Sequence, residues 1–140
     1  MLKLKILSVG KNKEKWLDEA FSEYVKRIKS IVQIECLWVR DTQQLIEWTQ
    51  KEPHYICLDP TGDLYTSEEF SKFLFHEWEI KGSRLTFLIG GAEGIPEILK
   101  QNRELISFSP LTFTHQMARL ILIEQVYRSI EIQKGSNYHK

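Results

Sequence analysis

Hydrophobic residues along the chain follow two spacings, one typical of strands and one typical of helices. Apolar and polar residues alternate over residues 2–9, which predicts a strand that ends at Gly10. Apolar residues on one face of residues 14–30 predict an amphipathic helix. By the same reading, further strands are expected at residues 33–39, 55–58, 85–89 and 105–108, and further helices at 43–50, 66–81, 96–103 and 115–133. Strands that alternate with helices predict an α/β fold with a mainly parallel sheet covered on both faces.

Local signals mark several boundaries of these elements. Thr66 and Glu69 form the pattern of a capping box, and Gly82 is placed to end the helix that follows it. Asp59–Gly62 reads as a turn that closes the third strand. Pro96 suits the first turn of the next helix. No repeat or linker interrupts the chain, so we expect one domain over residues 1–140.

The carboxyl ends of parallel strands are where α/β folds bind ligands, and here they carry unusual residues. Leu58 ends one strand, and the glycine-rich segment Gly90–Gly94 follows the next. Such glycines either let backbone amides approach a ligand or serve only the turn, and the sequence leaves this open. The loop 108–113 is apolar, as expected for the wall of a pocket or for a segment buried in a monomer core.

Composition and charge exclude several classes of protein. The net charge is zero, but residues 1–30 hold 8 Lys/Arg against 4 Asp/Glu, residues 41–80 hold 2 against 9, and residues 81–140 hold 8 against 5. The basic ends either form a face for phosphate or are ordinary solvated helix surfaces. No apolar run has the length of a membrane span, and lysines interrupt the N-terminal stretch, so we expect neither a membrane anchor nor a signal peptide. Cys36 and Cys57 lie in apolar strands and are expected to be free thiols of a cytoplasmic protein.

The distribution of polar side chains argues against metal and covalent hydrolase chemistry. The four histidines are far apart and have no metal-ligand spacing, so no metal is expected. The helix at 115–133 is apolar on more than one side, which predicts packing against a second subunit or, alternatively, a central position in a monomer. His115 and Arg119 on this helix must pair, reach solvent or line a site.

Several short segments, taken together and in order, resemble the ribosomal RNA large subunit methyltransferase H family, a branch of the SPOUT superfamily. The resemblance covers the whole chain. The matching segments are Leu4–Lys11, Leu58–Gly62, Phe87–Gly94, Ser107–Ser109, Leu111–Phe113, His115–Arg119, Glu124–Arg128 and Tyr138–Lys140. One departure from the family pattern is Thr114, because members of the family commonly have a proline before the residue that corresponds to His115. This departure leaves the shape of the loop before His115 less defined.

The resemblance implies a SPOUT-type α/β fold with a mainly parallel sheet of five to six strands and a C-terminal trefoil knot, an exception to the rule against threaded chains. It implies a homodimer that binds S-adenosylmethionine at the knot. The implied reaction transfers a methyl group to N3 of a pseudouridine in 23S rRNA of the assembled ribosome. Two alternatives remain: a dimeric ribosome-binding protein without turnover, and a SPOUT methyltransferase that acts on tRNA. Members of the latter kind often carry an extra RNA-binding domain, for which 140 residues leave no room.

The resemblance also assigns site residues. The residues implied to contact the cofactor are Leu58, Gly90, Phe108, Ser109, Pro110, Leu111, Thr112 and Phe113. The implied catalytic residues are Tyr138, His139 and Arg119. His139 would act as a base or proton relay, a role for which the imidazole side chain is generally suited near neutral pH, and Tyr138 would stack on or hydrogen-bond the target base. Arg119 would hold a phosphate or stabilise negative charge developing on the base.

Overall fold

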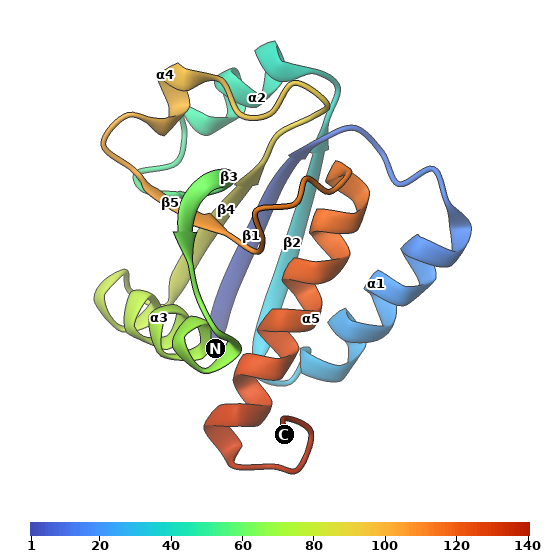
Figure 1. Ribbon diagram of the computed structural model, residues 1–140, viewed down its shortest axis with the longest axis vertical. Coiled ribbons are helices and arrows are strands. Elements are labelled where there is room, and N and C mark those ends of the chain that lie inside the picture. Colours follow the sequence, from blue (N-terminus) through green and yellow to red (C-terminus); the bar gives the residue numbers. More distant parts are fainter.

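The computed structural model describes residues 1–140 and contains one five-stranded sheet in which every strand is parallel to its neighbours (Figure 1). The strand order is β2-β1-β4-β3-β5. The strands are β1 (Leu2–Val9), β2 (Val32–Val39), β3 (Ile56–Leu64), β4 (Arg84–Ile89) and β5 (Glu104–Ser107). The helices are α1 (Lys15–Ile28), α2 (Thr42–Thr49), α3 (Ser67–Ile80), α4 (Glu97–Lys100) and α5 (His115–Lys134). The predicted α/β class with a parallel sheet is confirmed.

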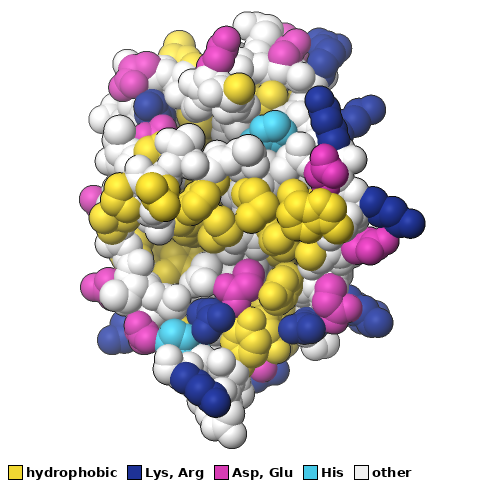
Figure 2. Space-filling view, turned by 45° about the vertical axis from the view of Figure 1, so that its right-hand side comes forward, with side chains coloured by type: hydrophobic (Ala, Val, Ile, Leu, Met, Phe, Trp, Pro, Cys, Tyr) yellow, Lys and Arg dark blue, Asp and Glu magenta, His cyan; other side chains and the backbone are white.

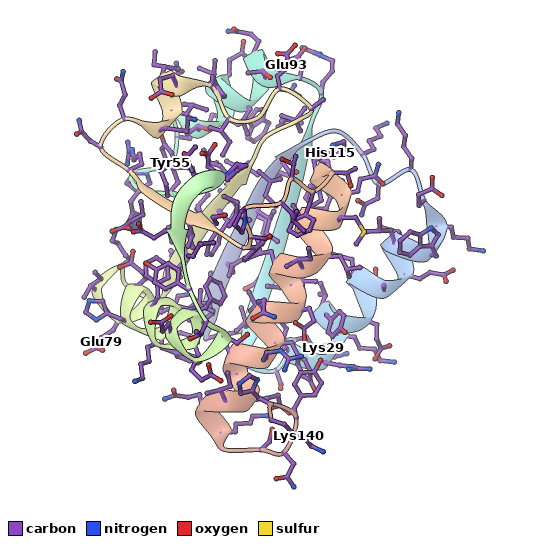
Figure 3. All side chains as sticks on the ribbon, viewed as in Figure 1. Lys29, Tyr55, Glu79, Glu93, His115 and Lys140 are labelled. Carbon is purple, nitrogen blue, oxygen red and sulfur yellow. The ribbon has the colours of Figure 1, made fainter.

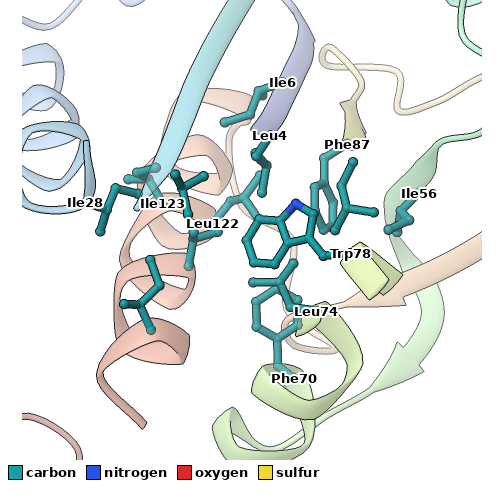
Figure 4. Packing of buried hydrophobic residues seen from close by; sticks show 14 of the residues in the cluster. Leu4, Ile6, Ile28, Ile56, Phe70, Leu74, Trp78, Phe87, Leu122 and Ile123 are labelled. Atoms are coloured by element: carbon teal, nitrogen blue, oxygen red, sulfur yellow. The ribbon is translucent and has the colours of Figure 1, made fainter. Parts of the chain in front are cut away.

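Three helices cover one face of the sheet and two cover the other. Leu4 and Ile6 of β1 join a core with α1, α3 and α5, whereas Leu7 joins a smaller core with α2 and α4. This division follows from the alternation of side chains along a strand. Figure 4 shows the larger core, in which Trp78 of α3 lies among residues of the sheet and of α5. The Trp78 indole donates a hydrogen bond of 2.9 Å to the carbonyl oxygen of Lys3, which satisfies its polar atom inside the core.

The helix boundaries follow the capping signals closely. The capping box of Thr66 and Glu69 is present at the start of α3. Gly82, with φ +69°, follows the end of that helix. Helix α5 begins after Thr114, whose hydroxyl accepts a hydrogen bond from Met117, and ends at Gly135 with φ +72°. Glycine adopts this left-handed conformation without steric cost.

Two boundaries differ from the prediction. Strand β3 does not end at Leu58: residues 59–62 bulge out, and pairing with β5 resumes at Asp63, which faces Ile106 just as Leu58 does. Gly62 makes this possible because a Cβ there would lie 2.6 Å from the backbone nitrogen of Ile106. The predicted helix at 96–103 is only the single turn Glu97–Lys100, with Pro96 before its first residue.

Helix α5 packs between α1 and α3 and spans the length of the sheet (Figure 1). Its buried positions include Leu122, Ile123 and Val126, whereas Leu120 and Ile121 remain half-exposed. No helix is long and apolar enough to cross a membrane. Both cysteines are free thiols, as predicted. The trefoil knot stays a prediction.

Candidate functional site

A cavity of about 730 Å³ opens at the carboxyl edge of the sheet. Its walls come from the bulge of β3, from the ends of β4 and β5, from the loop after β5, and from the first turns of α1 and α5. The site therefore lies where parallel α/β sheets bind ligands. Its wall is largely apolar, with a few polar groups, which is the usual composition of a site for an organic ligand.

Seven of the eight residues expected to contact the cofactor line this cavity. They are Leu58, Gly90, Phe108, Ser109, Leu111, Thr112 and Phe113. Pro110 belongs to the same loop but is not part of the wall. The structure thus brings together three segments that are distant in the sequence, while their contact with a ligand stays a prediction.

The glycine segment after β4 forms a tight turn in the cavity wall. The Gly94 amide donates a hydrogen bond of 2.9 Å to the Gly91 carbonyl oxygen. A Cβ at Gly90 would lie within 2.6 Å of the Gly94 carbonyl oxygen and the Ile95 nitrogen, so no larger residue fits there without moving the backbone. The turn therefore requires glycine at position 90, and this turn shapes the wall of the cavity.

Hydrogen bonds between serine hydroxyls and backbone groups hold the loop after β5. The buried Ser107 hydroxyl donates to the Ser109 carbonyl oxygen over 2.8 Å and accepts from the Ser109 amide over 3.2 Å. The Leu111 amide donates to the Ser109 hydroxyl over 3.0 Å. These local bonds leave Leu111 71% exposed and Phe113 38% exposed. The loop therefore presents apolar side chains to the cavity and to solvent.

Two titratable side chains in the wall have shifted pKa values. Asp59 is 7% exposed and pairs with Lys100 over 3.3 Å. Burial alone would raise the pKa of Asp59, but hydrogen bonds from Thr61 and the charge of Lys100 outweigh it and lower the pKa. For His115, burial and then the charges of Arg119 and Lys13 lower the pKa, so the ring is neutral at neutral pH. Asp59 is thus a structural anion, and His115 is one of the groups that line the site.

Arg119 lies behind the cavity wall and is fully buried. Its guanidinium donates to the Ser8 hydroxyl over 2.7 Å, to Asn12 Oδ1 over 2.9 Å and to the Val9 carbonyl oxygen over 2.7 Å. It also donates to the carbonyl oxygen of Gly10. All of its donor nitrogens are engaged within the chain, so the predicted contact with a substrate phosphate is not supported. Arg119 instead fixes the segment that follows β1.

The C-terminal tail lies at the opposite end of α5 from the cavity. The Tyr138 hydroxyl donates to Glu124 over 2.8 Å, and His139 contacts both Glu68 and Arg128. The 20 residues of α5 at 1.5 Å each separate the two ends by about 30 Å. Figure 3 shows His115 at the cavity end of α5 and Lys140 near its other end, although the tail turns back so that Tyr138 reaches Glu124, near the middle of the helix. Within one chain, the predicted catalytic tail and the predicted cofactor residues do not meet.

Sequence reasoning missed the contribution of α1. Trp16 and Leu17, with Glu14 before them, form part of the cavity wall. These residues are about 40 to 100 positions away from the other wall segments, and only the lysine-rich composition of the preceding loop sets them apart in the sequence.

Comparisons with known proteins agree with this architecture. A chain from Protochlamydia amoebophila named "Ribosomal RNA large subunit methyltransferase H" is 66% identical over 140 residues, which covers 100% of both chains. One of the same name from Coprothermobacter proteolyticus is 39% identical, with 99% of this chain and 100% of that one covered.

The fold is also similar to that of solved methyltransferase structures. A probable methylase family protein from Haemophilus influenzae has a TM-score of 0.56 at 11% identity, covering 99% of this chain and 70% of that one. A probable methyltransferase from Bordetella pertussis has a TM-score of 0.57 at 7% identity, covering 92% and 96%. Residues 2–139 match the family model described as "Predicted SPOUT methyltransferase". The chain therefore belongs to the SPOUT methyltransferases, in the branch of the ribosomal RNA large subunit methyltransferases H.

Proposed function

We propose that this protein is a cytoplasmic, S-adenosylmethionine-dependent methyltransferase that modifies N3 of a pseudouridine in 23S rRNA of the assembled ribosome. The observation that carries the proposal is the cavity at the carboxyl edge of the sheet, where seven of the eight expected cofactor residues come together. The names of the full-length relatives support the RNA substrate. Membership in the methyltransferase family supports a methyl donor as cofactor.

The residues present fit S-adenosylmethionine. The volume of about 730 Å³ is within the range of pockets for organic ligands. Leu58, Leu111 and Phe113 line the cavity and would cover the faces of the adenine, and the tight turn at Gly90 would let backbone groups approach it. When bound, the cofactor supplies an electrophilic methyl group attached to a sulfonium. The protein then has to align the target nitrogen and exclude water.

The remaining chemical task is removal of the proton from N3 of the base. We assign this step to His139 as base or proton relay, with Tyr138 as the residue that stacks on or hydrogen-bonds the base. Because no residue of the tail lines the cavity of its own chain, it would serve the cavity of a second subunit. Arg119 would act indirectly, by holding the loop after β1.

An apolar surface supports the proposed homodimer. Figure 2 shows a band of hydrophobic side chains across the face formed by α1 and α5. Exposed or half-exposed apolar residues of α5 and of the loop before it include Leu111, Phe113, Met117, Leu120 and Ile121. A contiguous exposed apolar surface of this kind typically marks an interface. A second copy packed here would bury the outer side of α5.

Calorimetric titration with S-adenosylmethionine, together with the mass of the protein in solution, tests the cofactor and the dimer. We expect micromolar binding by a dimer of two 16.6 kDa chains. Methylation is then compared on purified tRNA and on ribosomes that lack the modification, with the product nucleotide identified by mass spectrometry. Methylation of tRNA in place of ribosomes, or binding of ribosomes without turnover, would reject the proposal.

Replacing His139 with alanine should lower the methylation rate by about 100-fold or more, the usual contribution of a general base. Affinity for S-adenosylmethionine should change little, because no tail residue lines the cavity and His139 is assigned to the target base and not to the cofactor. His76→Ala is the matched control, since His76 is exposed on α3. An unchanged methylation rate in the His139 variant would remove this role.

A mixing experiment tests whether the tail acts between subunits. A heterodimer of the His139→Ala chain and a chain with a disrupted cavity, such as Gly90→Ala, contains one intact cavity and one intact tail. If they belong to the same composite site, mixing two inactive proteins restores part of the activity. No recovery in verified heterodimers would contradict action across the interface.

A further inference from the structure

The loop between β1 and α1 forms part of the rim of the cavity and is basic. Lys11 and Lys13 are exposed, and neither forms an ion pair within the chain. Lys15, by contrast, forms an ion pair with Glu19, with 3.8 Å between Nζ and Oε1. Figure 2 shows Lys and Arg side chains beside the hydrophobic band on this side of the molecule. The rim therefore carries positive charge that the protein does not neutralise itself.

An exposed aromatic side chain accompanies these lysines. Trp16, in the first turn of α1, contributes to the cavity wall and is 57% exposed. Its side chain has no hydrogen-bond partner or aromatic contact in the chain. A large aromatic surface left open beside unpaired cations is the combination that binds single-stranded nucleic acid. The exposed Glu14 follows Lys13 in the sequence, so Lys11, Lys13 and Glu14 together keep a net charge of +1 (two lysines against one glutamate).

This segment is held rigidly although it is exposed. Arg119 binds the carbonyl oxygens of Val9 and Gly10 and the side chain of Asn12. The Lys13 amide donates to Gln116 Oε1 of α5 over 3.0 Å. The buried arginine therefore orients a surface loop, which reduces the entropy lost when that loop binds a ligand.

We infer that Lys11, Lys13 and Trp16 form a docking site for unpaired rRNA nucleotides next to the target base. The two lysines would contact phosphates, and Trp16 would stack on a neighbouring base. This inference rests on the proposed function and extends it, because it explains how a chain with zero net charge engages RNA. The positive charge is concentrated at the rim of the cavity and need not extend over the whole surface.

The test compares Lys11→Ala/Lys13→Ala with Lys26→Ala/Lys29→Ala. The second pair removes the same charge from exposed positions at the far end of α1. Cosedimentation with ribosomes that lack the modification, over a range of salt concentrations, measures binding without requiring turnover. We expect the first variant to bind about tenfold more weakly, and the slope of log affinity against log salt to fall by about 1.4, or 0.7 for each lost phosphate contact. The control should keep the wild-type slope.

Trp16→Ala tests the stacking contact. Its expected effect is a rise of about fivefold to 100-fold in KM for ribosomes, and Trp16→Phe should restore most of the affinity. The mass of the dimer should remain unchanged, and the rise in KM for ribosomes should persist at saturating S-adenosylmethionine, which separates the ribosome contact from any effect of this cavity-wall residue on the cofactor. A Trp16→Ala protein that becomes monomeric would show that this side chain is a subunit contact and would overturn its assignment to RNA.

The two proposals fail in different ways. If the wild type binds ribosomes without methylating them, the proposed activity is wrong, and the salt slopes still decide the role of the lysines. Equal slopes for the two lysine variants would overturn the docking site even in an active enzyme. Failure of the wild type to bind ribosomes at all would overturn both.

Discussion

Replacing Gly90 with alanine should lower the affinity for S-adenosylmethionine by about 100-fold, a loss of about 2.7 kcal/mol of binding free energy. The added Cβ would come within 2.6 Å of the Gly94 carbonyl oxygen and the Ile95 nitrogen. Both are backbone atoms and have no side-chain rotation with which to relieve the contact. The turn must therefore open, which displaces the cavity wall between β4 and α4. Calorimetry measures the affinity, and circular dichroism checks that the sheet is retained.

Gly91→Ala is the control for this prediction. A Cβ at Gly91 would lie 3.1 Å from Cγ1 of Val9, which is a side-chain atom that can move by a few tenths of an ångström. The same added methyl group at position 91 should therefore reduce the affinity for S-adenosylmethionine much less than it does at position 90. Wild-type affinity in a folded Gly90→Ala protein would show that the turn is not part of the cofactor site.

Replacing Arg119 with methionine should lower the free energy of unfolding by about 3 kcal/mol. Methionine fills much of the volume but leaves the buried Ser8 hydroxyl and the half-buried acceptors of Val9, Gly10 and Asn12 without their donor. Removing the charge does recover its desolvation cost, because burial lowers the pKa of Arg119 to about 10 and the group is still protonated at neutral pH. The loss of four acceptor contacts outweighs this gain, since each unsatisfied buried group costs about 1–3 kcal/mol.

Urea unfolding at a fixed protein concentration measures this effect. Arg40→Met is the matched control because Arg40 is exposed, and its stability should change by less than about 0.5 kcal/mol. Arg119→Lys should fall between the two, since one ammonium cannot reach all the acceptors that the guanidinium fork spans. If Arg119→Met is as stable as the control, the buried network does not hold the loop after β1.

Most of the fold could be predicted because its signals are local. Alternation along residues 2–9 predicts β1 at its observed bounds, and the capping box at Thr66 locates the start of α3. The shape of β3 could not be predicted in this way. Its bulge depends on the close approach of Gly62 to Ile106, and these residues are 44 positions apart. Residues 59–64 are also mostly exposed, so they carry no hydrophobic pattern that records their pairing.

The candidate site divides in the same way. The glycine turn and the apolar loop are continuous segments, and their composition already sets them apart in the sequence. The role of Arg119 could not be predicted in this way, because its hydrogen-bond partner Ser8 is 111 positions away in β1. No spacing rule links an arginine in a C-terminal helix to the first strand and the loop after it. Likewise, only the structure shows that Trp16 belongs to the cavity wall.

The sequence by itself therefore determined the α/β class, most element boundaries and the segments that form the cavity. Periodicity and capping depend on residues that are close together in the sequence, so they can be recognised from short segments alone. Only the tertiary structure decided which segments meet, that Arg119 binds the end of β1 and the loop after it, and that no residue of the tail lines the cavity of its own chain. These properties depend on the parallel strand order, which places the bulge of β3 beside the ends of β4 and β5 while α5 carries the chain toward the opposite edge.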